Sequence, residues 1–140
     1  MSGLTLAEAQ KALAAGLKKA DEIGQPMNVA VVDAGGHLLA FARQDGAIRA
    51  SIDISQRKAV TSILMAAPTG ALTDLVQPGA ELYGLEQLAG GLVIFGGGIP
   101  VERDGEIVGA VGVSAGSVEQ DTVVAEAAVA ALGRRPRAKR

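Results

Sequence analysis

The chain has 140 residues and a formal net charge of −2, with 49% hydrophobic but only 2% aromatic residues. These values predict a single globular domain whose core is built from Ala, Val, Leu and Ile. The absence of cysteine excludes disulfides, thiolate nucleophiles and cysteine-ligated zinc, and the single histidine, His37, excludes a multi-histidine metal site within one chain.

Basic residues are concentrated at the C-terminal end. Residues 134–140 hold five of the 13 basic residues, which leaves residues 1–133 with 8 basic and 15 acidic residues. An acidic body argues against nucleic acid as a partner, so we expect one domain over 1–133 and a basic, disordered tail. No apolar run approaches the roughly 18 residues that span a bilayer, and the N-terminus lacks a signal-peptide pattern. We therefore expect a cytoplasmic protein without membrane contact.

The first third of the chain predicts a helix followed by a β-hairpin. Thr5 and Glu8 form a capping box, and Gly24 is a natural helix stop. Two short apolar runs, 27–33 and 37–43, flank an Ala-Gly-Gly turn, which is typical of a hairpin.

A second helix is predicted over 51–67, and residues 68–91 carry only short helical patterns. The residues that this helix is expected to bury are Ile52, Ala59, Val60, Ile63 and Leu64.

The last third predicts more strands and a final helix. We expect a strand over 92–98, a hairpin that turns at Asp104-Gly105, and a helix that opens with a Ser117/Gln120 capping box. Because hairpins imply antiparallel pairing, the fold is predicted to be α+β, with an antiparallel sheet of about five strands flanked by α-helices.

Glycine is frequent near the last strands. The run Gly96–Gly98 matches neither a Walker loop nor a dinucleotide fingerprint. Gly109 and Gly112 occupy opposite faces of the predicted last strand, where glycine usually means that a helix, a neighbouring chain or a ligand comes very close.

Several polar residues are candidates for chemistry. Asp33 and His37 flank a short turn, where a carboxylate would fix the imidazole tautomer for a general base or a metal ligand; alternatively, Asp33 only caps its own turn. Lys58 either reaches the edge of a pocket or lies on a solvated helix face. Glu119 and Asp121 either form an acid pair or only stabilise the N-terminus of the last helix.

Four segments together resemble the GlcG/HbpS-like family, which is labelled haem-degrading and is related to the C-terminal domain of PduO-type corrinoid proteins. The segments are MNVAVVDAGGHLLAFARQDGA, SQRKAVTSI, FGGGIPV and IVGAVGVSAGSVEQD. The resemblance implies a profilin-like domain, homo-oligomers that are often octamers, and haem binding in some members. The usual GVSGG of the family is GVSAG here, with Ala115 in place of a glycine. The motif residues of the family fall here on Asp33, Gly35, Gly36, His37, Lys58, Gly96, Gly97, Gly98, Pro100, Gly112, Val113, Ser114, Glu119, Gln120 and Asp121.

Three functions follow as hypotheses. The first is binding of haem, another tetrapyrrole or a small molecule, with His37 as the axial metal ligand. The second is a cofactor-independent isomerase, lyase or hydratase that acts on a small organic acid or carbonyl compound, and the third is a non-catalytic oligomeric accessory protein. We expect the first hairpin turn to face the start of the last helix around one pocket. The candidate catalytic residues are Asp33, His37, Glu119 and Asp121, and the candidate cofactor contacts are His37, Lys58, Gly97, Gly98 and Ser114.

Overall fold

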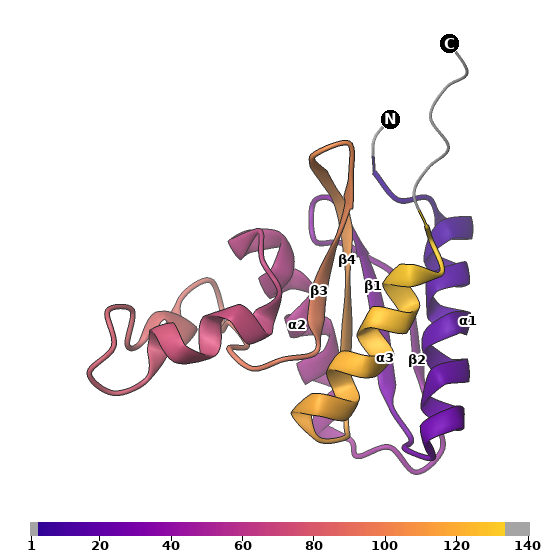
Figure 1. Ribbon diagram of the computed structural model, residues 1–140, viewed down its shortest axis with the longest axis horizontal. Coiled ribbons are helices and arrows are strands. Elements are labelled where there is room, and N and C mark those ends of the chain that lie inside the picture. Colours follow the sequence, from indigo (N-terminus) through magenta and orange to yellow (C-terminus); the bar gives the residue numbers. More distant parts are fainter. Residues whose placement is uncertain (1–2, 134–140) are drawn as a thin grey trace.

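The computed structural model describes residues 3–133, which form three layers (Figure 1). The elements are α1 (Leu6–Ile23), β1 (Asn28–Asp33), β2 (Leu38–Arg43), α2 (Ala50–Met65), the 3-10 helices η1 (Thr69–Val76) and η2 (Leu85–Gln87), β3 (Gly98–Arg103), β4 (Glu106–Ser114) and α3 (Val118–Ala130). The predicted basic tail, 134–140, lies outside the described residues.

The central layer is an antiparallel sheet with the strand order β2-β1-β4-β3. Helix α2 packs on one face against β4, β1 and β3, whereas α1 and α3 pack against each other on the other face (Figure 1). The α+β class and the antiparallel sheet flanked by helices are therefore confirmed, with four strands rather than about five.

The strand expected over 92–98 is absent, because threonine hydroxyls bind the backbone of that segment. Thr61 accepts from the Val93 N–H (3.0 Å), Thr73 donates to the Ile94 carbonyl (2.6 Å), and Thr69 accepts from the Gly98 N–H (2.9 Å). Side-chain partners thus replace a neighbouring strand until β3 begins.

The α1/α3 face is packed by apolar side chains. The valines of β1 and β4 meet alanines of both helices, and Gly16 of α1 lies against Val29 and Ala128. Both predicted capping boxes are present, Thr5 with Glu8 and Ser117 with Gln120. This face follows the usual rule of apolar periodicity.

The α2 face is packed by backbone contact. Gly98 and Gly112 are cross-strand partners, and a Cβ on Gly112 would overlap the carbonyl oxygen of Ser55. The helix therefore rests directly on the sheet. Of the predicted buried stripe, Ala59 is buried, Ile52, Val60 and Ile63 are only partly buried, and Leu64 is 55% exposed. The residues that α2 buries are Ser51, Ser55, Lys58, Ala59, Thr61 and Ser62.

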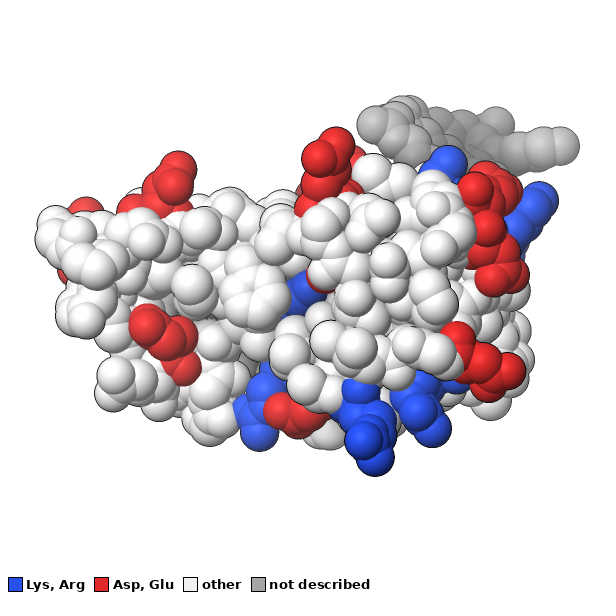
Figure 2. Space-filling model, turned by 90° about the horizontal axis from the view of Figure 1, so that it is seen from below, with Lys and Arg blue, Asp and Glu red and all other residues white. Residues whose placement is uncertain are grey.

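Residues 66–97 project from the sheet as an arm, on the left of Figure 1. The arm exposes Leu75, Leu82, Tyr83 and Leu88. No basic residue occurs between positions 58 and 103, so the charged groups of the arm are all acidic. Figure 2 shows this as red and white on its left side, with blue confined to the body.

No single helix within residues 3–133 is long and apolar enough to cross a membrane, although α2 and η1, which are bent by 80°, pass that test of length and composition as a pair.

Candidate functional site

The turn between β1 and β2 is organised by one carboxylate. Oδ1 of Asp33 accepts the backbone N–H groups of Gly35 and His37, both at 2.9 Å, and lies 3.3 Å from Nδ1 of His37. These contacts, led by the hydrogen bond from the His37 N–H, lower the pKa of Asp33. Asp33 therefore caps its own turn and also lies next to the imidazole of His37. The two roles that the sequence offered as alternatives are both present.

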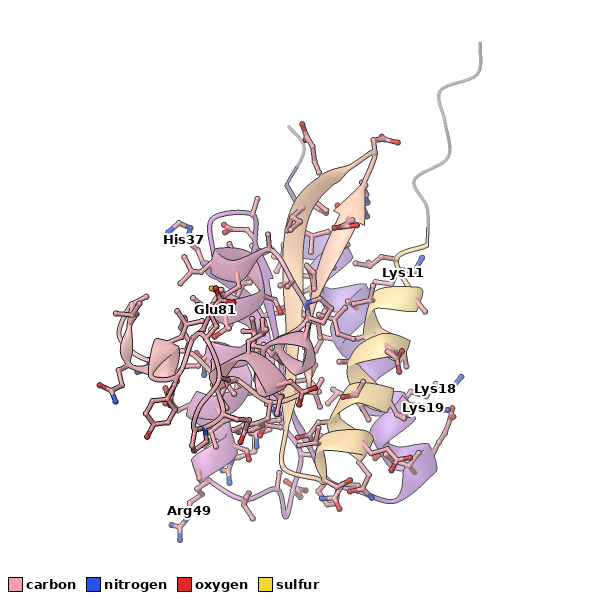
Figure 3. The ribbon with its side chains drawn as sticks, turned by 60° about the vertical axis from the view of Figure 1, so that its left-hand side comes forward. Lys11, Lys18, Lys19, His37, Arg49 and Glu81 are labelled. Atoms are coloured by element: carbon pink, nitrogen blue, oxygen red, sulfur yellow. The ribbon has the colours of Figure 1, made fainter. Side chains whose placement is uncertain are left out.

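His37 projects from the molecule. Its side chain is 82% exposed, and Figure 3 shows the ring pointing away from the helices and strands. The imidazole ring lies against the backbone of Gly35. A Cβ at Gly35 would be only 2.9 Å from Nδ1 and Cε1 of His37, so any side chain at this position would displace the ring. With Nδ1 held towards Asp33, Nε2 faces solvent and is available to a metal.

Apolar side chains lie next to His37 on the α2 face of β2. Leu38 pairs with Val32 and is 50% exposed, and Phe41 pairs with Ala30 and is half-buried. Val60 of α2 lies beside the same turn, because a Cβ built on Gly36 would be 3.9 Å from its side chain. Since α2 packs mainly on the other three strands, this corner of the sheet is uncovered and suits a flat apolar ligand.

Lys58 and Asp121 form an ion pair inside the protein. Nζ of Lys58 donates to Oδ2 of Asp121 (2.9 Å) and to the carbonyl of Val113 (2.7 Å), and lies 5.0 Å from the centre of the Phe95 ring. The side chains are 0% and 4% exposed. Burial lowers the pKa of Lys58 and raises that of Asp121, and the hydrogen bond between them opposes both shifts.

Asp121 also fixes the turn before α3. Its Oδ1 accepts the N–H of Gly116 (2.9 Å), and Ala115 beside it has a φ of 136°, a region that side chains avoid. The backbone at Ala115 is therefore strained. Glu119, in contrast, is exposed, so the predicted acid pair with Asp121 is not formed.

A cleft of about 460 Å³ lies between α3 and the segment before β3, lined among others by Gly70, Gly96, Gly97, Gly98, Thr122 and Glu126. A Cβ at Gly97 would lie 2.6 Å from Nζ of Lys58, so this glycine of the cleft lining packs directly against the ion pair. Ser114 is buried as well, with its hydroxyl 3.0 Å from that of Ser51. Of the predicted cofactor contacts, Gly97 and Gly98 thus face a cavity, whereas Lys58 and Ser114 lie behind it.

The expected common pocket does not exist within one chain. The β1–β4 register places Asp33 opposite Gly109 and Asn28 opposite Ser114, at the two ends of the sheet. Five residue steps along a strand correspond to about 17 Å. The sequence identified both groups but could not give the strand order that separates them.

Sequence reasoning missed the pairing of Lys58 with Asp121. The available signal was the helical spacing of Lys58 with Ser51, Ser55 and Ser62, which places the lysine on a face of small residues that a helix can bury. Within residues 3–133, no three His, Asp or Glu side chains gather as a metal cluster.

Comparison with known proteins identifies the family. The family model for the haem degrading protein HbpS-like matches residues 4–130. The chain belongs to the HbpS-like family. This confirms the resemblance seen in the sequence.

Individual relatives are similar over most of the chain. An uncharacterized 15.0 kDa protein from the dhaT-dhaS intergenic region of Citrobacter freundii is 50% identical over 128 residues, which are 90% of this chain and 89% of that protein. The corrinoid adenosyltransferase PduO of Salmonella typhimurium is 43% identical over 84% of this chain but only 35% of its own length. A solved structure of a PduOC–haem complex superposes with a TM-score of 0.90 at 39% identity and covers 94% of this chain and 96% of that one.

Proposed function

We propose that the protein binds haem or a related metallated tetrapyrrole, with Nε2 of His37 as an axial ligand. The observation that carries the proposal is the only imidazole of the chain, held outward by Asp33 at an exposed turn. One protein ligand suffices for haem, because the porphyrin itself supplies four nitrogens to the iron. The PduOC–haem complex supports the choice of ligand, because that protein shares this fold at 39% identity.

The surroundings of His37 support the same ligand class. A porphyrin needs apolar surface against its face, and Leu38, Phe41 and Val60 provide it beside the imidazole. The carboxylate of Asp33, 3.3 Å from Nδ1, would accept the N–H of the neutral ring and so strengthen Nε2 as a ligand of iron.

The acid–base enzyme hypothesis receives less support. It placed Asp33 and His37 with Glu119 or Asp121, either in one chain or across a subunit boundary. Within one chain these groups lie at opposite ends of the sheet, so only the arrangement across a boundary is left. Asp121 is moreover enclosed with Lys58, so it does not reach a substrate in this conformation.

The test is a hemin titration followed by the Soret band. The wild-type protein is expected to bind hemin with a shifted Soret maximum, and His37→Ala to bind at least about tenfold more weakly with a spectrum close to that of free hemin. Gly35→Ala, which displaces the ring, is expected to lie between the two.

Matched controls distinguish His37 from other possible ligands. Tyr83 is 66% exposed and is the only tyrosine, so Tyr83→Phe removes the alternative phenolate ligand. We expect Tyr83→Phe to leave the spectrum unchanged. Hemin binding that persists in His37→Ala but is lost in Tyr83→Phe would overturn the proposal, as would the absence of any Soret shift in the wild type.

A further inference from the structure

The cleft between α3 and the segment before β3 lies apart from His37. His37 precedes β2, at one edge of the sheet, whereas Gly98 begins β3 at the other edge. The volume of the cleft, about 460 Å³, is within the range of small-molecule sites, which is about 300–1,000 Å³. The cleft is therefore separate from the tetrapyrrole site and large enough for a ligand of its own.

Two backbone N–H groups in the wall of the cleft have no acceptor. The N–H of Gly98 donates to Thr69, and the carbonyl of Gly97 accepts from Val113. Within the described part of the chain, the N–H groups of Gly96 and Gly97 donate to no protein atom, although both residues are buried. Because buried N–H groups are almost always paired, these two adjacent donors suit an oxygen acceptor of a ligand.

The backbone of Gly96 is open on the side of the arm. A Cβ built on Gly70 would lie 3.5 Å from Cα of Gly96 and 3.9 Å from its nitrogen. Since Gly70 is exposed and has no side chain, a small group from solvent can take this place. Thr122 of α3 lies on the other side of Gly96, 2.8 Å from a Cβ built on that residue. The cleft thus reaches the unpaired donors from one direction.

The other groups of the cleft are acceptors or apolar surface. Among the described residues that line it, Glu126 is the only charged one, and it is exposed. The hydroxyl of Thr122 donates to the Val118 carbonyl (2.8 Å), which leaves its lone pairs free to accept. Ile99 and Val129 provide apolar surface. A matching ligand therefore has an acceptor for the glycines, a donor for the carboxylate and an apolar part.

We propose that this cleft binds a small, uncharged carboxamide. The carbonyl oxygen accepts the N–H groups of Gly96 and Gly97, and the amide nitrogen donates to the carboxylate of Glu126. The hydrocarbon part of the ligand lies on Ile99 and Val129, which are half-buried. A carboxamide carries its acceptor and its donors on one carbon, so a single group meets both kinds of partner.

Charge selects an uncharged ligand over an anion. A carboxylate has acceptors only, and the carboxylate of Glu126 repels it. Lys58 does not offset this repulsion, because it is buried and already paired with Asp121. The arm beside the cleft adds no cation, since no basic residue occurs between positions 58 and 103.

Benzamide and benzoate are matched probes for this selectivity. They share the aromatic ring and differ in the charge and the donors of the polar group. In ligand-observed NMR titrations at neutral pH, the protein is expected to bind benzamide at least about tenfold more tightly than benzoate. Absence of benzamide binding, or equal affinities for the two probes, would overturn the proposal.

Two variants test the groups that the proposal assigns. Glu126→Gln removes the charge at an exposed position and is expected to reduce the preference for benzamide to less than about threefold. Gly70→Ala places a methyl group in the approach to Gly96, at an ordinary contact of 3.5 Å, and is expected to weaken benzamide binding at least about fivefold. Gly3→Ala is the matched control, because its Cβ would have no neighbour closer than 4.0 Å. An unchanged preference in Glu126→Gln, or equal binding by Gly70→Ala and Gly3→Ala, would contradict the proposal.

His37→Ala separates this site from the tetrapyrrole site. Because His37 lies at the other edge of the sheet, the variant is expected to bind benzamide with the affinity of the wild type. A loss of benzamide binding in His37→Ala would place the probe at the tetrapyrrole site and overturn the proposal. None of these titrations contains haem, so the result does not depend on the proposed function.

Discussion

The two faces of the sheet hold their helices by different means. On the α1/α3 face, Val and Ala side chains interdigitate, and Gly16 leaves space for an ordinary contact of 3.4 Å. On the α2 face, Gly98 and Gly112 let the helix backbone touch the sheet, and Lys58 of α2 forms a buried ion pair with Asp121 of α3, a helix of the other face. The first face should tolerate small changes in volume, whereas the second should not, because backbone cannot move aside as a side chain can.

The largest effect is expected from breaking the buried ion pair that joins Lys58 of α2 to Asp121 of α3. Lys58→Met leaves Asp121 charged, buried and without its cation, which should cost about 3–5 kcal/mol of unfolding free energy. The double variant Lys58→Met/Asp121→Asn should lose less than Lys58→Met alone, because no unpaired charge remains. Urea denaturation of the two single variants and the double variant measures the coupling. Additive losses would show that the pair is not coupled.

The next largest effect should come from the glycine contact. Gly112→Ala places a methyl group on the backbone of Ser55 and should cost about 3 kcal/mol. Gly16→Ala is the control on the other face; it gains up to about 1 kcal/mol of helix propensity at a contact of 3.4 Å. Thermal melts of both variants are the measurement. Similar melting temperatures for Gly112→Ala and Gly16→Ala would show that the two faces of the sheet tolerate an added methyl group equally well.

An ion pair on the α1/α3 side should have a smaller, pH-dependent effect. Arg103 pairs with Glu8, and this contact lowers the pKa of Glu8 from 4.5 to about 2. Because the folded pKa is the lower one, the stabilisation is complete above pH 4.5 and disappears as the pH falls towards 2; we expect about 1–2 kcal/mol.

Glu8→Gln should accordingly flatten the dependence of the urea midpoint on pH across that range. Glu22→Gln is the control, because it removes only an exposed pair with Lys19 at 3.6 Å. A pH profile of Glu8→Gln that is parallel to the wild type would rule out this role of Glu8.

The smallest expected effect is a gain of stability. Ala115→Gly relieves the strain at φ 136° and should raise the unfolding free energy by about 1 kcal/mol after the entropy cost of glycine. Ala127→Gly, inside α3, should instead lose about 1 kcal/mol. Opposite shifts of the melting temperature are the expected result. A loss in both variants would mean that the turn before α3 is not strained.

Much of the fold was accessible from local patterns. The capping boxes of α1 and α3 and both hairpins depend on residues that are close in sequence, and the structure contains all of them. The buried stripe of α2 was predicted only in part, because periodicity assumes packing by large side chains, whereas the residues fully buried by α2 are mostly small and polar. The sequence did indicate a close approach at Gly112, but not that the backbone of α2 makes it.

The candidate site also contains one part that local sequence predicted and one part that it did not. The proximity of Asp33 and His37 follows from a short turn and was predicted correctly. The single pocket that was expected to include Glu119 and Asp121 depended on which ends of the strands coincide, and antiparallel pairing of β1 with β4 put them apart.

The sequence by itself therefore determined the elements, their caps and the position of the one imidazole in a tight turn, since these depend on interactions over a few residues. Only the tertiary structure decided that Lys58 is buried against Asp121, 63 positions away, and that β2 forms an open edge. Both facts depend on the order in which distant strands assemble, which is set by the packing of the whole chain rather than by any local pattern.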